Sequence, residues 1–148
     1  MSLRIAGALA LLVASSPETQ DLGTAVPIAG SWNYAPAADG SEAVFANASG
    51  APQLWIHCTR ATRRITISKP ASAAVPFLNI WTSSQTKNLP SSFNPATGRV
   101  TTDISNYDPL LDAIVSSRGR IAFTVGPQPP LVVPPWAEVA RVIEDCRA

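Results

Sequence analysis

Two runs of alternating apolar and polar residues, QLWIHC and RITIS, flank a short polar turn between residues 53 and 68. Successive side chains of a β-strand point to opposite faces, so this alternation predicts two strands joined as a hairpin. One face of the hairpin would carry Trp55 and His57. The other face would be apolar and would carry Leu54, Ile56, Cys58, Ile65 and Ile67. The hairpin therefore predicts a sheet with one buried face, and it places a cysteine in that face.

The second cysteine of the chain, Cys146, lies close to the C-terminus. The spacing of WAEVARVIEDC predicts an amphipathic helix that begins near Pro135. Its apolar face would carry Trp136, Val139, Ala140, Ile143 and Cys146. A Cys58–Cys146 disulfide would join this helix to the hairpin and would stabilise the fold by roughly 4 kcal/mol. Two free thiols or a metal site are the alternatives, but two cysteines and one histidine do not make a zinc motif.

The start of the chain has the features of a signal peptide, which we expect over residues 1–15. A short positive start, Met1–Arg4, precedes ten apolar residues, IAGALALLVA. A membrane-spanning helix needs about 20 apolar residues, so this run is too short for one. A buried helix or strand of a cytosolic protein is the alternative. We expect a periplasmic or secreted protein without stable membrane insertion, a flexible lead-in over residues 16–30 and one domain over residues 31–148.

The composition favours short strands and restricts the function classes. The 148 residues suffice for one domain, and 14 prolines and 8 glycines interrupt the apolar runs. Charged residues make up only 14% of the chain, against about a quarter in an average domain. The formal charge of +1 argues against a nucleic-acid-binding protein, which normally has a basic domain.

Other segments complete a predicted α+β fold, mainly an antiparallel β-sandwich of short strands with two helices late in the chain. Asp108-Pro109 predicts a helix start, with Leu110, Leu111, Ile114 and Val115 at helical spacing and Gly119 as the stop. Further strands are expected at 31–35, 42–46, 77–83, 99–105 and 120–125. We expect an exposed loop at 84–98 and a rigid proline-rich connector, at most an edge strand, at 127–135.

The strand EAVF…PQLWIHCTRATRRITIS, the segment DPLLDAIVSSRGRIAFTV and the final WAEVARVIEDCR together resemble small exported bacterial proteins. Their layout is similar to periplasmic type VI secretion-associated TagO/VasI-like proteins and, more loosely, to invasion-associated locus B proteins. It resembles more closely uncharacterised exported proteins of alphaproteobacteria that carry SRGR and a terminal EDCR. The resemblance covers residues 32–147 and implies architecture and location, but no catalytic residues.

His57 is the only histidine and the first candidate for catalysis. A carboxylate pair from Asp103, Asp108 and Asp112 could serve glycoside hydrolysis, but the spacing alone does not indicate it. A Ser–His–Asp arrangement would need a serine and a carboxylate brought to His57 by the fold, and no G-x-S-x-G motif is present. A half-exposed strand histidine that bonds a neighbour is the alternative. We therefore expect no enzyme activity, no cofactor and no metal.

Arginines and tryptophans form the candidate binding patch. Three arginines crowd the hairpin turn and two flank Gly119. With one tryptophan from each of two strands and with His57, they make a set of eight: Trp55, His57, Arg60, Arg63, Arg64, Trp81, Arg118 and Arg120. Guanidinium groups suit carboxylates and phosphates, so a shared cationic spot would bind an anionic envelope ligand or an acidic partner. Solvated turn residues, with Arg118 or Arg120 paired to Asp112 or Glu144, are the alternative, as is burial of the tryptophans.

These features predict an exported, non-enzymatic module that binds a protein partner or an envelope component. A small hydrolase that uses His57 is one alternative. An inhibitor that inserts the 84–98 loop into a wall-degrading enzyme is another.

Overall fold

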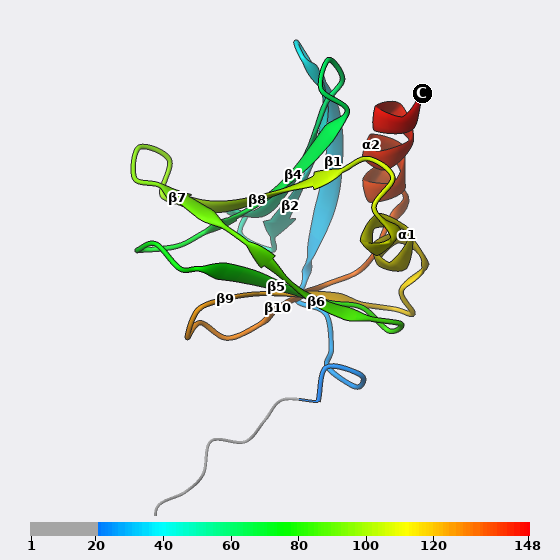
Figure 1. Cartoon of the computed structure of the whole chain (residues 1–148). Coiled ribbons are helices and arrows are strands. Elements are labelled where there is room, and N and C mark those ends of the chain that lie inside the picture. Colours follow the sequence, from blue (N-terminus) through cyan, green and yellow to red (C-terminus); the bar gives the residue numbers. More distant parts are fainter. Residues whose placement is uncertain (1–20) are drawn as a thin grey trace, which may run out of the picture.

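A computed structural model describes residues 21–148. The expected signal peptide and the first part of the lead-in, residues 16–20, lie outside the described residues. The fold consists of two antiparallel sheets and two helices (Figure 1). The six-stranded sheet has the order β1 (Gly30–Ala37), β2 (Gly40–Asn47), β3 (Pro52–Thr59), β4 (Arg64–Pro70), β8 (Arg99–Ser105), β7 (Ser92–Asn94). The four-stranded sheet has the order β10 (Leu131–Val133), β9 (Ile121–Val125), β5 (Phe77–Trp81), β6 (Thr86–Pro90).

The helices are α1 (Pro109–Ser116) and α2 (Ala137–Arg147), and both lie at the same end of the space between the two sheets (Figure 1). The predicted mainly antiparallel β-sandwich with two late helices is therefore confirmed. None of the helices within residues 21–148 is long and apolar enough to span a membrane.

The hairpin predicted from alternation is β3–β4. Cys58 pairs with Ile65 and Ile56 with Ile67, so the apolar side chains of the two strands share one face. Every residue predicted for that face is buried, with at most 1% of its surface exposed: Leu54, Ile56, Cys58, Ile65 and Ile67. Burial of this set fixes the pairing register of β3 and β4, because a shift by one residue would turn all of these side chains toward solvent.

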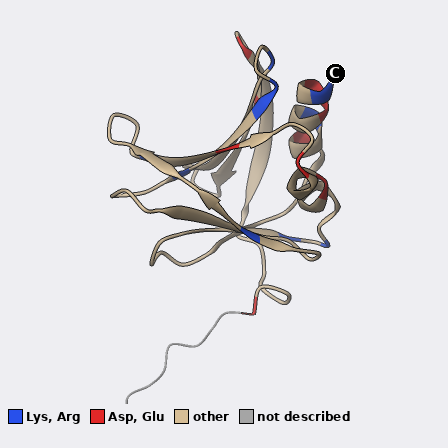
Figure 2. Cartoon of the chain, in the orientation of Figure 1, with Lys and Arg blue, Asp and Glu red and all other residues tan. Residues whose placement is uncertain are grey.

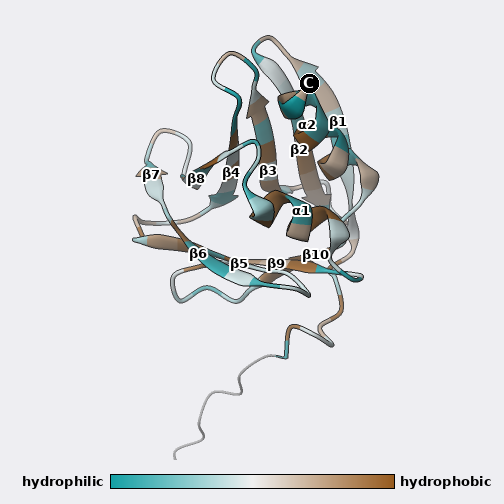
Figure 3. Cartoon of the chain, turned by 45° about the vertical axis from the view of Figure 1, so that its right-hand side comes forward, coloured by the Kyte–Doolittle hydropathy of each residue, from teal (hydrophilic) through white to brown (hydrophobic). Residues whose placement is uncertain are grey.

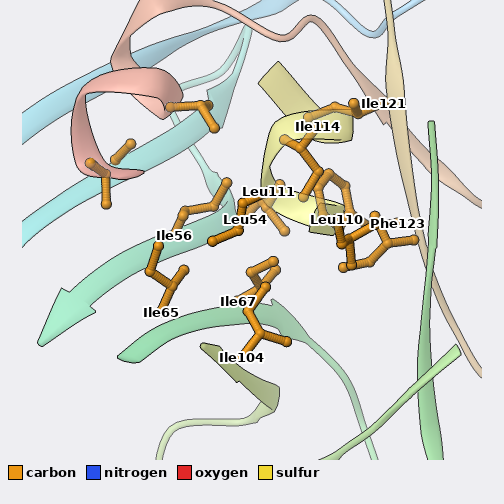
Figure 4. Close-up of a cluster of buried hydrophobic side chains, with 14 of the residues drawn as sticks. Leu54, Ile56, Ile65, Ile67, Ile104, Leu110, Leu111, Ile114, Ile121 and Phe123 are labelled. Carbon is orange, nitrogen blue, oxygen red and sulfur yellow. The ribbon is translucent and has the colours of Figure 1, made fainter. Parts of the chain in front are cut away.

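Helix α1 begins where the sequence predicts and fills the space between the sheets. The Asp108 carboxylate accepts a hydrogen bond from the backbone N–H of Leu110 (2.9 Å), and Pro109 occupies the first turn. Figure 4 shows Leu110, Leu111 and Ile114 between the side chains of β3 and β4 and those of β9. Val115, which has helical spacing with this set, is 40% exposed instead, because an eight-residue helix between two layers leaves one side to solvent.

Helix α2 covers the inner face of the six-stranded sheet, and the Cys58–Cys146 disulfide joins the two. The two Cα atoms lie 5.6 Å apart. Val139, Val142 and Ile143 are buried beside Cys146. Trp136 is 45% exposed, so its predicted place in the core is wrong. Trp136 precedes the helix in an extended conformation, and the spacing of helical faces therefore does not apply to it.

The loop predicted at residues 84–98 is also wrong, because this segment forms β6 and β7. β6 pairs with β5 in one sheet and β7 pairs with β8 in the other, so one stretch of chain passes between the sheets. Both are edge strands, where proline and polar side chains are tolerated. β6 buries only Leu89, which leaves no alternation in the sequence to reveal it.

Part of the lead-in packs against the four-stranded sheet. Ala25 is buried against Ala122 and Val132, and Trp81 contacts the same cluster. The backbone N–H of Ile28 donates to the carbonyl of Val132 (2.9 Å). Residues 21–29 therefore cover the outer face of β9 and β10. The middle of the predicted proline-rich connector forms β10, which is an edge strand of this sheet.

Replacement of both Cys58 and Cys146 with alanine should lower the free energy of unfolding by roughly 4 kcal/mol. The disulfide spans 88 residues of sequence, and its loss frees the unfolded chain. Urea unfolding of the double variant, compared with the oxidised wild type, measures this difference. A double variant as stable as the wild type would contradict the assigned role of the disulfide.

A second prediction concerns pH, because the hydroxyl of Tyr34 donates to the Asp145 carboxylate of α2 (2.6 Å). This hydrogen bond lowers the pKa of Asp145 below its ordinary value. The stabilisation is therefore present at neutral pH and is lost as the pH falls through the lowered pKa, below about pH 4. Tyr34→Phe should cost about 1 kcal/mol at pH 7 and little at pH 3.

The matched control is Tyr107→Phe, whose exposed hydroxyl lies 3.5 Å from the carbonyl of Arg147 and bonds no carboxylate. Urea unfolding at pH 7 and pH 3 compares the two variants. A Tyr34→Phe effect that does not change with pH would show that Asp145 is not the group involved.

Candidate binding site

The eight residues of the predicted patch lie in three places on the molecule. The β3–β4 turn, which carries three of the arginines, contacts the C-terminal end of α2. The α1–β9 loop, which carries the other two, lies beside the four-stranded sheet at a different end of the molecule (Figure 1). One cationic spot made from both loops is therefore not present.

The arginines of the β3–β4 turn bind other parts of the same chain. Arg64 donates to the Asp103 carboxylate of β8 (2.5 Å), and Arg63 donates to the carbonyl of Arg147 (3.4 Å). Arg60 is exposed, and its backbone N–H bonds the carbonyl of Asp39 (2.9 Å). Arg63 and Arg64 thus hold the hairpin to the C-terminus and to β8, whereas the Arg60 side chain has no hydrogen bond or ion pair within residues 21–148.

Trp55 and His57 lie on the outer face of the six-stranded sheet, and both are covered by charged neighbours. The guanidinium of Arg99 lies 3.5 Å from the ring centroid of Trp55, a cation–π contact. The two ring nitrogens of His57 contact Glu42 (3.1 Å) and Asp39 (2.9 Å). The hydrogen bond with His57 lowers the pKa of Asp39. Since both nitrogens contact carboxylates, neither is left to take a proton from a serine.

The remaining three predicted residues share one hollow of about 400 Å³, here called the arginine hollow. Its lining residues come from the lead-in, from the end of β5 and from the α1–β9 loop: Gly23, Trp81, Ser83, Arg118 and Arg120. Trp81 faces the hollow because β5 alternates, with Leu78 and Ile80 turned into the core. Trp81 also packs against the cluster of Ala25, Ala122 and Val132.

Two serines hold the α1–β9 loop against the end of β5. The backbone N–H of Ser83 donates to Ser117 Oγ, and the backbone N–H of Arg118 donates to Ser83 Oγ, each at 2.9 Å. Ser117 Oγ donates in turn to the carbonyl of Arg120. Gly119 has φ +73°, a conformation that favours glycine and makes the turn between the arginines tight. Both arginines are therefore carried on a loop that is fixed at both ends.

The arginine hollow is cationic and has unused donors. Arg120 donates from one terminal nitrogen to the carbonyl of Gly23, but its buried Nε has no hydrogen-bond partner within residues 21–148. In the same part of the chain, neither Arg118 nor Arg120 pairs with a carboxylate. Asp21 of the lead-in accepts from the backbone N–H of Gly23 (2.9 Å).

Apart from Asp21, which bonds the lining residue Gly23, the segments that form the arginine hollow carry no acidic residue. Residues 71–102 and 113–137, which include the whole four-stranded sheet, contain no aspartate or glutamate. Figure 2 accordingly shows no red on these strands. Two guanidinium groups in such surroundings can bind carboxylate or phosphate oxygens through charge-assisted hydrogen bonds. Within the described residues, no group of three His, Cys, Asp or Glu side chains could hold a metal ion.

Sequence reasoning named Trp81, Arg118 and Arg120 but missed Ser83 and Gly23. Ser83 lies two residues after the end of β5 and gave no signal beyond its polarity. Gly23 enters the site only because the lead-in docks on β9 and β10, which nothing local in its sequence predicts. Comparison of the chain with protein-family models, curated proteins and solved structures finds no match. The resemblance to exported bacterial proteins therefore stays a prediction.

A second hollow, of about 240 Å³, lies near a buried lysine between the sheets. It is lined by the β4–β5 connection, by Val125, Pro127 and by Gln128, whose amide oxygen accepts from Lys69 Nζ (3.0 Å). Lys69 is 8% exposed, and burial lowers its pKa. The lysine hydrogen bond joins β4 to the β9–β10 turn, which explains the residue without a ligand.

This burial generates a stability prediction. A lowered pKa in the folded state means that charged Lys69 costs stability at neutral pH, and that the cost falls as the pH rises toward the ordinary lysine pKa. Lys69→Met should therefore raise the free energy of unfolding by roughly 1 kcal/mol at pH 7 and by less at pH 10. Lys87→Met, at an exposed position where the ammonium lies 3.5 Å from the Asp108 carboxylate, is the comparison, and loss of this ion pair should make it slightly less stable than the wild type. A destabilised Lys69→Met protein at pH 7 would contradict the prediction.

Proposed function

We propose that this protein is an exported, non-enzymatic module that binds an anionic envelope component through the arginine hollow. The observation that carries the proposal is that Arg118 and Arg120 line one hollow beside the Trp81 ring and that neither pairs with a carboxylate within residues 21–148. An anionic ligand in the hollow can accept charge-assisted hydrogen bonds from these guanidinium groups, which are stronger than the bonds that a neutral ligand offers.

Export is supported by the expected signal peptide and by the disulfide. Cys58 and Cys146 are almost fully buried and joined, and structural disulfides persist mainly in oxidising compartments such as the periplasm. An envelope component is the anionic ligand that a protein in this compartment meets.

A binding role is favoured over the two alternatives by the places of their key residues. The hydrolase alternative depends on His57, whose ring nitrogens contact Asp39 and Glu42 on an outer sheet face. The inhibitor alternative depended on a projecting loop at residues 84–98, which forms two edge strands instead. The arginine hollow, in contrast, combines a concave shape with donors that no group of the described chain uses.

An NMR titration with galacturonic acid, a sugar that carries one carboxylate, tests the proposal. Backbone amide signals around the arginine hollow should shift and saturate, and neutral galactose at the same concentration should leave them in place. Arg118→Gln combined with Arg120→Gln should weaken binding at least about tenfold, because charge-assisted hydrogen bonds are lost. Binding should also weaken as salt is added.

The matched control is the double variant Arg60→Gln and Arg63→Gln, which removes the same charge from the β3–β4 turn and should leave the affinity unchanged. Equal galacturonate affinity in the wild type and the Arg118/Arg120 double variant would contradict the proposal. So would equal binding of galactose.

A further inference from the structure

The outer face of the four-stranded sheet continues from the arginine hollow along β5. Phe77, Asn79 and Trp81 alternate with the buried Leu78 and Ile80, so the three side chains form a row on this outer face. Phe77 is 50% exposed at one end of the row. Trp81 lines the arginine hollow at the other end.

Neutral polar side chains lie on both sides of this row. Asn79 Nδ2 donates to Asn88 Oδ1 of β6 (2.6 Å), and Asn79 pairs in register with Thr124 of β9. Thr86 pairs in register with Trp81. We call this surface the β5 face; it consists of Phe77, Asn79, Trp81, Thr86, Asn88 and Thr124. It carries no charge, so charge enters only at the end where Arg118 and Arg120 lie.

The β5 face is the half of the outer surface that the lead-in does not cover. Residues 21–29 contact β9 and β10 through Ala25 and Ile28, and they reach Trp81. Figure 3 shows β9 and β10 largely in hydrophobic colours, whereas hydrophilic colour lies along part of β5 and β6. The hydrophobic half is covered, and the half with amides and hydroxyls is left open.

We infer that the β5 face binds the chain of an acidic polysaccharide, with a carboxylate of that chain in the arginine hollow. This inference rests on the proposed function and names its ligand class. A pyranose ring has an apolar C–H face and a polar rim, so it suits an exposed aromatic ring flanked by amides and hydroxyls. Phe77 and Trp81 are four strand positions apart, or about 13 Å, which exceeds one sugar ring. The ligand must therefore be an oligomer.

Other partners fit these observations less well. A protein interface has an apolar centre and buries about 800 Å² on each partner, but the open half of this surface holds one strongly exposed aromatic residue among polar side chains. A nucleic-acid strand carries a charge on every nucleotide and binds along a track of cations. Here the cations lie at one end only, and the rest of the row is neutral.

The test compares galacturonic acid with its linear trimer, measured by NMR titration of the full exported chain. The wild-type protein should bind the trimer at least tenfold more tightly than the monomer, because only the trimer reaches Phe77. Phe77→Ala should remove this gain and leave monomer binding as it was. Arg118→Gln combined with Arg120→Gln should weaken the binding of both the monomer and the trimer.

Two further variants guard against misfolding as an explanation. Tyr107→Ala removes another exposed aromatic side chain, 65% exposed, beside Arg147, and should change neither affinity. Asn79→Asp adds a negative charge to the β5 face without truncation, and it should weaken trimer binding and spare the monomer.

The outcomes separate the two proposals. A trimer that binds no more tightly than the monomer, or a Phe77→Ala protein that keeps the full gain, would overturn the inference about the polysaccharide and leave the anion site. A wild-type protein that does not bind galacturonic acid would overturn the proposed function itself. Tighter binding of a single-stranded oligothymidylate than of the trimer would overturn the inference in favour of nucleic acid.

Discussion

The disulfide between Cys58 and Cys146 is the constraint on which the arrangement of the molecule depends. It attaches the last turn of α2 to the middle of the six-stranded sheet, where both sulfur atoms are buried. The chain between the two cysteines includes the whole four-stranded sheet and α1. One covalent bond thus closes the layered core, and the C-terminal helix is held on the inner face of β1–β3.

With the core closed in this way, the two outer sheet faces differ in how their charges are satisfied. On the six-stranded sheet the charged and aromatic side chains bind one another: Arg64 with Asp103, His57 with two carboxylates, and Arg99 with Trp55. On the four-stranded sheet no acidic residue is available. The arginines beside it therefore keep donors that the described chain does not use, which is the physical basis of the proposed anion site.

Local patterns in the sequence predict the elements, and contacts between distant segments decide the site. Alternation revealed β3–β4, and a capping aspartate with proline revealed α1, because each signal lies within a few residues. The edge strand β6 was missed, since it buries a single side chain, and Trp136 was misplaced because it precedes the helix. Trp81, Arg118 and Arg120 were named among eight candidates, but hydrogen bonds of Ser83 and Ser117 between distant segments bring them together. The Gly23 side of the hollow comes from the docking of residues 21–29, and neither contact has a local signal.

The most direct test of the central claim is the Nε–H signal of Arg120 in a ¹⁵N-resolved spectrum during titration with galacturonic acid. We expect this signal to move with saturation, since an anion bound at the Arg120 guanidinium changes the surroundings of the Nε–H group. The Nε–H signal of Arg64, already bonded to Asp103, should stay in place. An unmoved Arg120 signal, or equal movement of both signals as in a general salt effect, would contradict the account.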